Sequence, residues 1–126
     1  MIKLLLVEDE PSVRKGLRMR LAAEPDVTIV GEAADDKAAL ALTRKLRPDV
    51  VLMDIEMPRL DGIAAAKALR AISPCIAVIL LTIHDDDATR ARAEAAGAAA
   101  CLTKRGLNDE LLAAIRQAAR RRTTQN

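Results

Sequence analysis

The segment Val50-Val51-Leu52-Met53-Asp54 decides the fold, because four consecutive apolar residues end there at a single carboxylate. A short apolar run without alternating polar residues is typical of a strand that is covered on both faces, as in a parallel sheet. Similar runs occur at 2–7, 27–31, 76–81 and 98–102, the last a poor strand by propensity that keeps the same rhythm. We therefore predict five strands, the third of which ends at Asp54.

Segments with helical periodicity separate these runs. Segment 12–24 places Val13, Leu17 and Leu21 on one face and lies between two prolines. The other predicted helices are 35–46, 60–72, 85–96 and a last helix that Asn108 can cap. Alternation of strands and helices predicts an α/β domain with right-handed βαβ crossovers.

The composition excludes several classes of protein. The chain has 126 residues, the size of one domain, and contains no Phe, Trp or Tyr, so it lacks the rings on which bases or flavins stack. A net charge of +2 gives no strong attraction for nucleic acid. No apolar run could span a membrane, and the start is unlike a signal peptide. We expect a cytoplasmic protein without a membrane partner, with its domain at 1–120 and a linker or C-terminal tail starting at 121–126.

Polar side chains follow the predicted strands at their carboxyl ends. Glu8 and Asp9 follow the first strand, Asp54 the third, Thr82 the fourth and Lys104 the fifth. Ligands of open parallel sheets bind outside the carboxyl ends of the strands, so these side chains are expected to converge.

Three carboxylates at one edge repel one another, at about 4 kcal/mol for each pair at about 4 Å and an effective dielectric constant near 20. One lysine cannot neutralise them, whereas Mg²⁺ prefers oxygen ligands and accepts phosphate oxygens. A carboxylate such as Asp54 can serve as a nucleophile and form an aspartyl phosphate. Thr82 and Lys104 can then bind phosphoryl oxygens, since phosphoryl transfer needs positioning and electrostatics.

At four places the sequence resembles the receiver domain of two-component response regulators. The resembling stretches are Leu4-Leu5-Leu6-Val7-Glu8-Asp9-Glu10, Val50-Val51-Leu52-Met53-Asp54-Ile55-Glu56-Met57-Pro58 with Asp61-Gly62, Leu80-Leu81-Thr82, and Leu102-Thr103-Lys104. The resemblance covers residues 2–120. It implies a flavodoxin-like, doubly wound (βα)5 three-layer sandwich, whose parallel five-stranded sheet has the order 2-1-3-4-5.

The resemblance also implies a role for each site residue. Asp54 would accept a phosphoryl group from a partner histidine kinase, and Thr82 and Lys104 would bind that group. The metal site for Mg²⁺ would comprise Glu8, Asp9 as a direct ligand, Asp54, and the backbone carbonyl of Glu56.

Segments 82–85 and 110–116 look most like the NarL/FixJ/LuxR-like subfamily, whose second domain is a helix-turn-helix DNA binder. This implies a regulator of transcription that contacts DNA through a domain absent from this chain, and that forms a homodimer on phosphorylation. A stand-alone receiver acting through protein–protein contacts is the alternative.

The chain departs from the family pattern at several positions. Glu8 replaces the commoner Asp, and Arg105 replaces a frequent proline, so we expect a trans Lys104–Arg105 bond. Cys101 stands where the family usually has Tyr or Phe, so a ring cannot change rotamer as the signal, and we expect the thiol merely to fill space. Ile83, His84 and Glu56 border the site by resemblance, and we expect them to modulate phosphorylation: Ile83 by crowding, Glu56 by like charge.

The predicted helix 85–96 lacks any large apolar residue. We expect an inner face drawn from Ala88, Ala91, Ala95 and Ala96. Pairing of Asp86 with Arg90 would add to the helix propensity of alanine. Such a helix is held loosely, and we hypothesise that phosphorylation acts on it and on the preceding loop.

Three rival functions compete with this interpretation. Asp54-Ile55-Glu56 superficially matches an aspartyl-phosphate-forming phosphatase, in which a second acid two residues on protonates the leaving group. A flavin or nucleotide binder is disfavoured because no glycine-rich phosphate loop occurs. A receiver that has lost phosphorylation is disfavoured because Asp9, Asp54, Thr82 and Lys104 are all present. The two cysteines give no sign of a zinc site. Cys75 and Cys101 form no CxxC pair, so zinc is not indicated.

Overall fold

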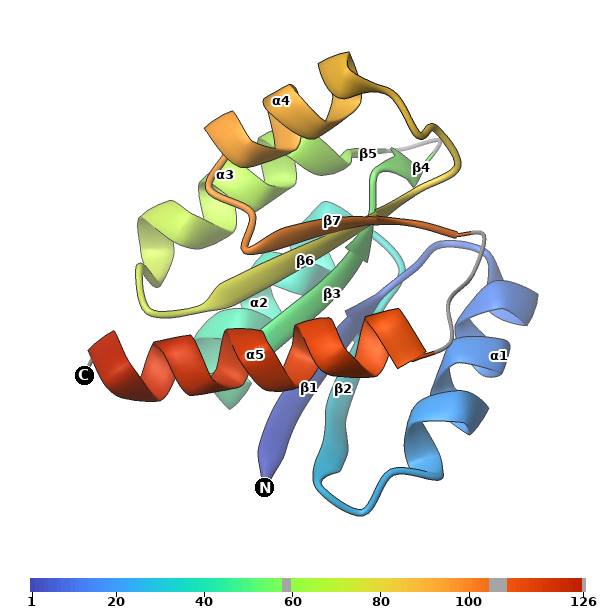
Figure 1. The fold of residues 1–126 in the computed structure, drawn as a ribbon. Helices are drawn as coiled ribbons and strands as arrows, with labels where there is room; N and C mark the ends of the chain where they lie inside the picture. Colours follow the sequence, from blue (N-terminus) through green and yellow to red (C-terminus); the bar gives the residue numbers. More distant parts are fainter. Residues whose placement is uncertain (58–59, 105–108, 126) are drawn as a thin grey trace.

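The computed structural model of the chain describes residues 1–57, 60–104 and 109–125. Five parallel strands form a central sheet with helices on both faces (Figure 1). The strands are β1 (Ile2–Val7), β2 (Val27–Ala33), β3 (Val50–Asp54), β6 (Ala77–Thr82) and β7 (Ala100–Thr103). The helices are α1 (Pro11–Ala22), α2 (Asp36–Leu46), α3 (Gly62–Ile72), α4 (Asp87–Ala95) and α5 (Asp109–Gln125).

The strand order is β2-β1-β3-β6-β7, which is 2-1-3-4-5 when the five long strands are counted along the chain. This confirms the predicted flavodoxin-like architecture. A two-residue antiparallel pair, β4 (Glu56–Met57) and β5 (Leu60–Asp61), follows β3 and was not predicted.

Successive residues of the central strands point to opposite faces of the sheet, as the pleat requires. Leu5, Met53 and Leu80 join a core cluster with residues of α2, α3 and α4. Leu4, Leu52 and Ile79 join the other cluster with residues of α1 and α5. Because both faces are covered, the stretches 4–7, 50–53 and 77–81 of the central strands are entirely apolar.

The boundaries differ from the predicted ones by a few residues. β2 continues to Ala33, and α3 begins at Gly62, where Asp61 accepts from the Ile63 amide. α5 runs on to Gln125, so residues 121–125 of the stretch predicted to start a linker or C-terminal tail are helical. The expected Asn108 cap and the Lys104–Arg105 bond lie outside the described residues. No helix of the described ranges combines the length and apolarity needed to cross a membrane.

The inner face predicted for α4 was correct at Ala96 and wrong at the other three alanines. Ala93 is its buried residue and Ala96 just beyond it is also buried, whereas Ala88, Ala91 and Ala95 are exposed. An alanine-rich helix offers no contrast between large and small apolar residues from which its rotation could be inferred. The expected ion pair was also wrong. Arg90 pairs with Asp85, while Asp86 caps the helix by accepting a hydrogen bond from the Thr89 amide at 2.7 Å.

Candidate functional site

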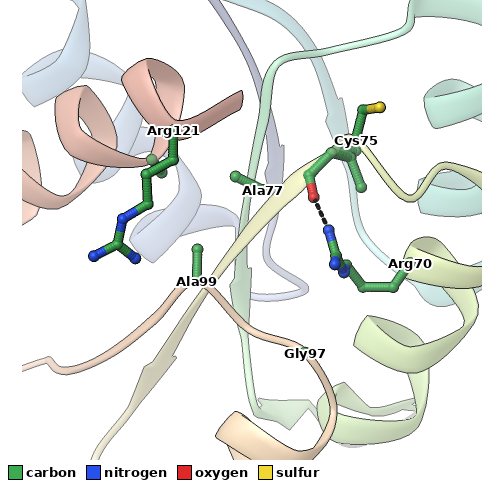
Figure 2. A pocket seen from close by; sticks show the side chains of 8 residues that line it. Arg70, Cys75, Ala77, Gly97, Ala99 and Arg121 are labelled. Atoms are coloured by element: carbon green, nitrogen blue, oxygen red, sulfur yellow. Dashed lines mark hydrogen bonds between the residues drawn. The ribbon is translucent and has the colours of Figure 1, made fainter. Parts of the chain in front are cut away.

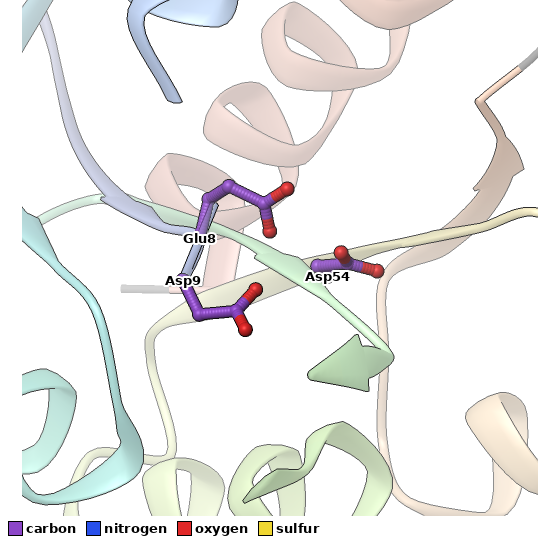
Figure 3. A group of neighbouring side chains, drawn as sticks. All are labelled: Glu8, Asp9 and Asp54. Carbon is purple, nitrogen blue, oxygen red and sulfur yellow. The ribbon is translucent and has the colours of Figure 1, made fainter. Parts of the chain in front are cut away.

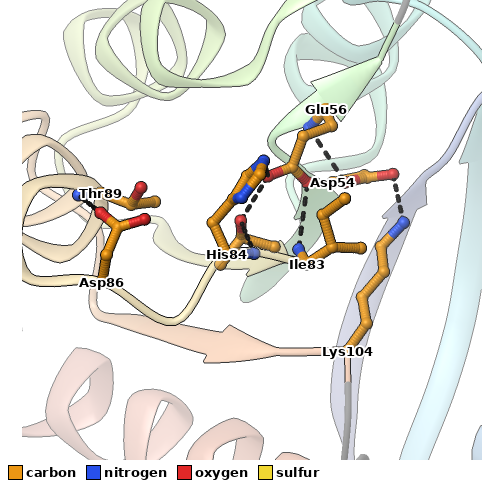
Figure 4. Close-up of polar contacts among 8 residues, drawn as sticks. Asp54, Glu56, Ile83, His84, Asp86, Thr89 and Lys104 are labelled. Carbon is orange, nitrogen blue, oxygen red and sulfur yellow. Dashed lines mark hydrogen bonds and ion pairs between the residues drawn. The ribbon is translucent and has the colours of Figure 1, made fainter.

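Asp54 is the last residue of β3 and is 3% exposed. Its Oδ2 accepts a hydrogen bond from Lys104 Nζ at 2.6 Å, and its Oδ1 accepts one from the Glu56 amide at 3.0 Å (Figure 4). Lys104 directly follows β7, so its hydrogen bond to Asp54 joins two residues that are far apart in the chain. The parallel sheet thus brings the two side chains to one edge, as the sequence predicts.

The carboxylates of Glu8, Asp9 and Asp54 lie together at this edge (Figure 3). Each offers an oxygen, and these oxygens lie within 4.8 Å of one another. Arg14 of α1 donates from Nη1 to the Glu8 carbonyl at 2.8 Å, which ties the acidic turn to the helix that follows it. Lys104 Nζ is 3.7 Å from Glu8 Oε1, so one ammonium group serves two of the three acids.

Glu8 is an acid in an unfavourable position. The residue is 2% exposed, and Oε2 has no hydrogen-bond partner among the described residues. Burial, together with the neighbouring Asp54 carboxyl, raises the pKa of Glu8 to about 8. Burial alone would lower the pKa of Lys104, but its hydrogen bond to Asp54 and the negative charges of the surrounding acids together outweigh this and raise the pKa. A buried oxygen without a partner and an all-oxygen donor set fit a hard divalent cation such as Mg²⁺.

Thr82 ends β6 at the same edge and is 1% exposed. Its hydroxyl donates to Glu56 Oε1 and accepts from the His84 amide at 3.0 Å (Figure 4). The other Glu56 oxygen, Oε2, accepts from the Ile83 amide at 3.4 Å. The structure therefore directs the Thr82 hydroxyl toward the Glu56 carboxylate, a contact that sequence reasoning missed.

The sequence profile of the family described as the response regulator receiver domain matches residues 4–116. The chain belongs to the response regulator receiver domain family.

Relatives of known sequence and structure agree with this assignment. The chain is 41% identical to the "Uncharacterized transcriptional regulatory protein YxjL" of Bacillus subtilis (strain 168), over 94% of this chain and 55% of that protein. It is 43% identical to a protein-glutamate methylesterase/protein-glutamine glutaminase of Anaeromyxobacter dehalogenans, over 82% of this chain and 31% of that protein.

A solved structure of a LuxR-family response regulator from Aurantimonas sp. SI85-9A1 superposes with a TM-score of 0.90 at 34% identity, covering 94% of this chain and 85% of that one. These likenesses confirm the predicted NarL/LuxR-like subfamily. The receiver domain spans about half the length of the curated relatives it matches.

Three further residues of the predicted site, Ile83, His84 and Cys101, differ in how far they are buried in the receiver domain. Ile83 is 57% exposed, and His84 is exposed with Nε2 4.0 Å from Glu56 Oε1. Cys101 of β7 is half-buried and packs against the core cluster on the α2–α4 face. Burial raises the pKa of its thiol, so the thiolate that reacts with oxidants is disfavoured.

Gly62 fixes the path of the chain beside Asp54. A Cβ atom there would lie 2.6 Å from Ile55 Cα and 2.7 Å from the Asp54 carbonyl oxygen. Both contacts are with backbone atoms, which cannot move aside as a flexible side chain can. A glycine is therefore required where α3 begins, because the chain passes so close to the backbone of Asp54 and Ile55 there.

A separate cavity of about 140 Å³ lies near the amino ends of β6 and β7, away from the site (Figure 2). Arg70, Cys75 and Arg121 are among the residues that line it. Arg70 Nη1 already donates to the Ile76 carbonyl at 2.8 Å and to the Pro74 carbonyl. Among the described residues that line this cavity, none is an acid of the kind grouped beside Asp54.

Proposed function

We propose that this receiver domain is a phosphorylation-dependent signalling switch, which takes a phosphoryl group onto Asp54 from the phosphohistidine of a partner histidine kinase. The observation that carries the proposal is the buried Asp54 carboxylate, held 2.6 Å from Lys104 Nζ and grouped with Glu8 and Asp9. A carboxylate nucleophile, an ammonium group and oxygen ligands for a cation are the parts that phosphoryl transfer onto an aspartate requires.

In the proposed reaction a carboxylate oxygen of Asp54 forms a bond to phosphorus. The bond between phosphorus and the donor breaks, and its electron pair stays with the kinase imidazole or, for acetyl phosphate, with acetate. The product is an acyl phosphate. Lys104 is close enough to Asp54 to bind one phosphoryl oxygen, and Thr82 can donate to another once its hydroxyl leaves Glu56.

Mg²⁺ is the cofactor that this donor set favours. Glu8, Asp9 and Asp54 would hold it, and the backbone carbonyl of Glu56 would complete the set. When bound, the ion neutralises negative charge on the acids and on the phosphoryl oxygens. The partnerless, buried Oε2 of Glu8 supports this assignment.

The proposed output is control of transcription in the cytoplasm, through a DNA-binding domain outside this chain and a homodimer that forms on phosphorylation. The relative described as a transcriptional regulatory protein and the LuxR-family structure support this output. The methylesterase relative shows that similar receiver sequences also occur beside an enzyme. A stand-alone receiver acting by protein–protein contact is the alternative. Sedimentation with and without beryllofluoride, a phosphoryl mimic, tests the dimer.

Action as a phosphatase is a weaker candidate. That function needs Glu56 as a proton donor to the leaving group, yet both Glu56 oxygens accept hydrogen bonds from Thr82 and Ile83. We expect one phosphoryl transfer per molecule followed by slow loss of the group, and no turnover of phosphate esters. Release of many equivalents of alcohol from an aryl phosphate ester would instead favour the phosphatase.

Intact-mass measurement after incubation with Mg²⁺ and acetyl phosphate tests the proposed function. We expect one added phosphoryl group on the parent chain, none on Asp54→Asn and little when the metal is chelated. Asp36→Asn is the matched control, because it removes an acid from the first turn of α2 rather than from the site. A phosphoryl group that persists on Asp54→Asn would overturn the proposal.

A further inference from the structure

The Glu56 carboxylate accepts hydrogen bonds from two donors at the carboxyl end of β6. Oε1 accepts from the Thr82 hydroxyl, and Oε2 accepts from the Ile83 amide at 3.4 Å (Figure 4). The backbone of Glu56 is fixed at the same time, because its amide donates to Asp54 Oδ1 at 3.0 Å. One residue therefore contacts both the proposed phosphoacceptor and two donors at the end of the neighbouring strand.

The Thr82 hydroxyl can satisfy only one acceptor at a time. A hydroxyl carries a single proton, and here that proton is used in the hydrogen bond that Thr82 donates to Glu56. The hydroxyl oxygen also accepts from the His84 amide at 3.0 Å, which limits rotation of the side chain. Thr82 is 1% exposed, so water is not a ready replacement partner.

We propose that the Glu56 side chain is an internal competitor of the phosphoryl group, holding the Thr82 hydroxyl and the Ile83 amide until the phosphoryl oxygens displace it. Glu56 is thus a positioning residue that sets the rate of phosphorylation through Thr82. This inference rests on the proposed function, because it describes how access to the same site is regulated.

A second explanation of the same residue would be plain repulsion. Glu56 carries a negative charge beside Asp54, and such a charge slows the approach of any anionic donor, whatever Thr82 does. The two explanations differ in one respect. Competition requires the Thr82 hydroxyl, whereas repulsion does not.

Four variants at two positions separate the explanations. Glu56→Ala removes both charge and acceptor, and Glu56→Gln removes the charge but keeps a carbonyl oxygen that can accept from Thr82. Thr82→Val keeps the shape of the threonine and removes its hydroxyl. Thr82→Ser, which retains the hydroxyl, is the matched control.

The rate of phosphorylation by acetyl phosphate with Mg²⁺ is then measured as a double-mutant cycle. We expect Glu56→Ala to increase the rate about tenfold, the factor that corresponds to about 1.4 kcal/mol. The same increase is expected when the change is made in the parent chain and when it is made in the Thr82→Ser background. In the Thr82→Val background the same change should alter the rate less than about twofold. Glu56→Gln should react more slowly than Glu56→Ala. Equal acceleration in the Thr82→Val and Thr82→Ser backgrounds would overturn the proposal in favour of repulsion.

An NMR measurement without any phosphodonor keeps this inference distinct from the proposed function. The Thr82 methyl and Ile83 amide resonances should shift in Glu56→Ala, and clearly less in Glu56→Gln, while resonances of β1 stay in place. If the parent chain took up no phosphoryl group but these shifts appeared, the proposed function would fail and the contact would stand. Unchanged Thr82 and Ile83 resonances in Glu56→Ala would overturn the contact itself.

Discussion

Strand β3 and helix α4 are packed very differently, although both lie beside the same site. Every residue of β3 is buried, including Leu52 and Met53 at 0% exposure. The buried residue of α4 is Ala93. A fully buried leucine contributes about 1.5–3 kcal/mol, and a single methyl group much less.

This difference separates the site into a rigid half and a loosely held half. Asp54 stands on a strand that is paired on both sides, by β1 and β6. The loop with Ile83 and His84 leads instead to α4, which is stabilised by the Asp86 cap and the exposed Arg90–Asp85 ion pair. Elements with few buried apolar contacts open at low free energy, and these are the elements that switching can move.

The largest expected effect is in hydrogen exchange. Amides of β1 and β3 should be protected about a thousandfold more than amides of α4, which corresponds to about 4 kcal/mol of opening free energy. Beryllofluoride should change exchange in α4 and in the loop at Ile83, and leave the central strands as they are. Exchange measured by mass spectrometry on peptides covers both elements in one experiment.

The comparison would break if α4 were as protected as the central strands in both states. The hypothesis that phosphorylation acts through α4 would then be wrong. A uniform change over the whole chain would point instead to global stabilisation by the ligand.

The next effect is in stability. Leu52→Ala should lower the free energy of unfolding by about 3–5 kcal/mol, because it leaves a cavity in the core. Ala93→Gly should lower it by less than about 1 kcal/mol, because α4 opens before the rest of the domain and the usual cost of glycine within a helix falls on that local opening. Urea unfolding followed by far-ultraviolet circular dichroism suits a chain without aromatic residues. Equal costs for the two changes would mean that α4 is as firmly packed as β3.

The same contrast explains what could be predicted from the sequence. The run 50–54 is uniformly apolar up to its final carboxylate, which indicates a strand buried on both faces and places its end at the site. Convergence of Glu8, Asp54 and Lys104 followed because parallel strands end at one edge. The orientation of α4 could not be predicted, since nearly all its candidate inner residues are alanines.

The contact between Glu56 and Thr82 was beyond sequence reasoning for a different reason. It depends on the rotamers of two side chains that are 26 positions apart, and no periodic pattern encodes those rotamers. Spacing along the chain indicated only that Glu56 lies near Asp54. The identity of its partner required the distances within the folded chain.

The rigid half also holds unfavourable charge, which pH should reveal. The folded state raises the pKa of Glu8 to about 8, against about 4.3 for a glutamate in an unfolded chain. A raised pKa means that the folded state binds the proton more tightly, so its stabilising contribution is complete below about pH 4.3 and is lost as the pH rises through 8.

In metal-free protein, the unfolding free energy of the parent should therefore fall relative to Glu8→Gln across this range, by on the order of a few kcal/mol. Glutamine cannot titrate, so the difference between the two curves isolates Glu8 from the other acids. Mg²⁺ should reduce the fall by stabilising the ionised carboxylate. Parallel curves for the two proteins in a chelator would show that the Glu8 carboxyl is not perturbed.

The smallest effects concern the two helix caps. Asp61 accepts hydrogen bonds from the amides of Ile63 and Ala64 at the start of α3, and Asp86 accepts one from Thr89 at the start of α4. Because α3 packs Leu69 into the core, Asp61→Ala should lower the free energy of global unfolding by about 1 kcal/mol. Asp86→Ala should leave the urea midpoint in place and speed exchange of the α4 amides, since α4 opens before the rest of the domain. If both changes shifted the midpoint equally, α4 would unfold together with the central sheet, and the division into a rigid and a loose half would not hold.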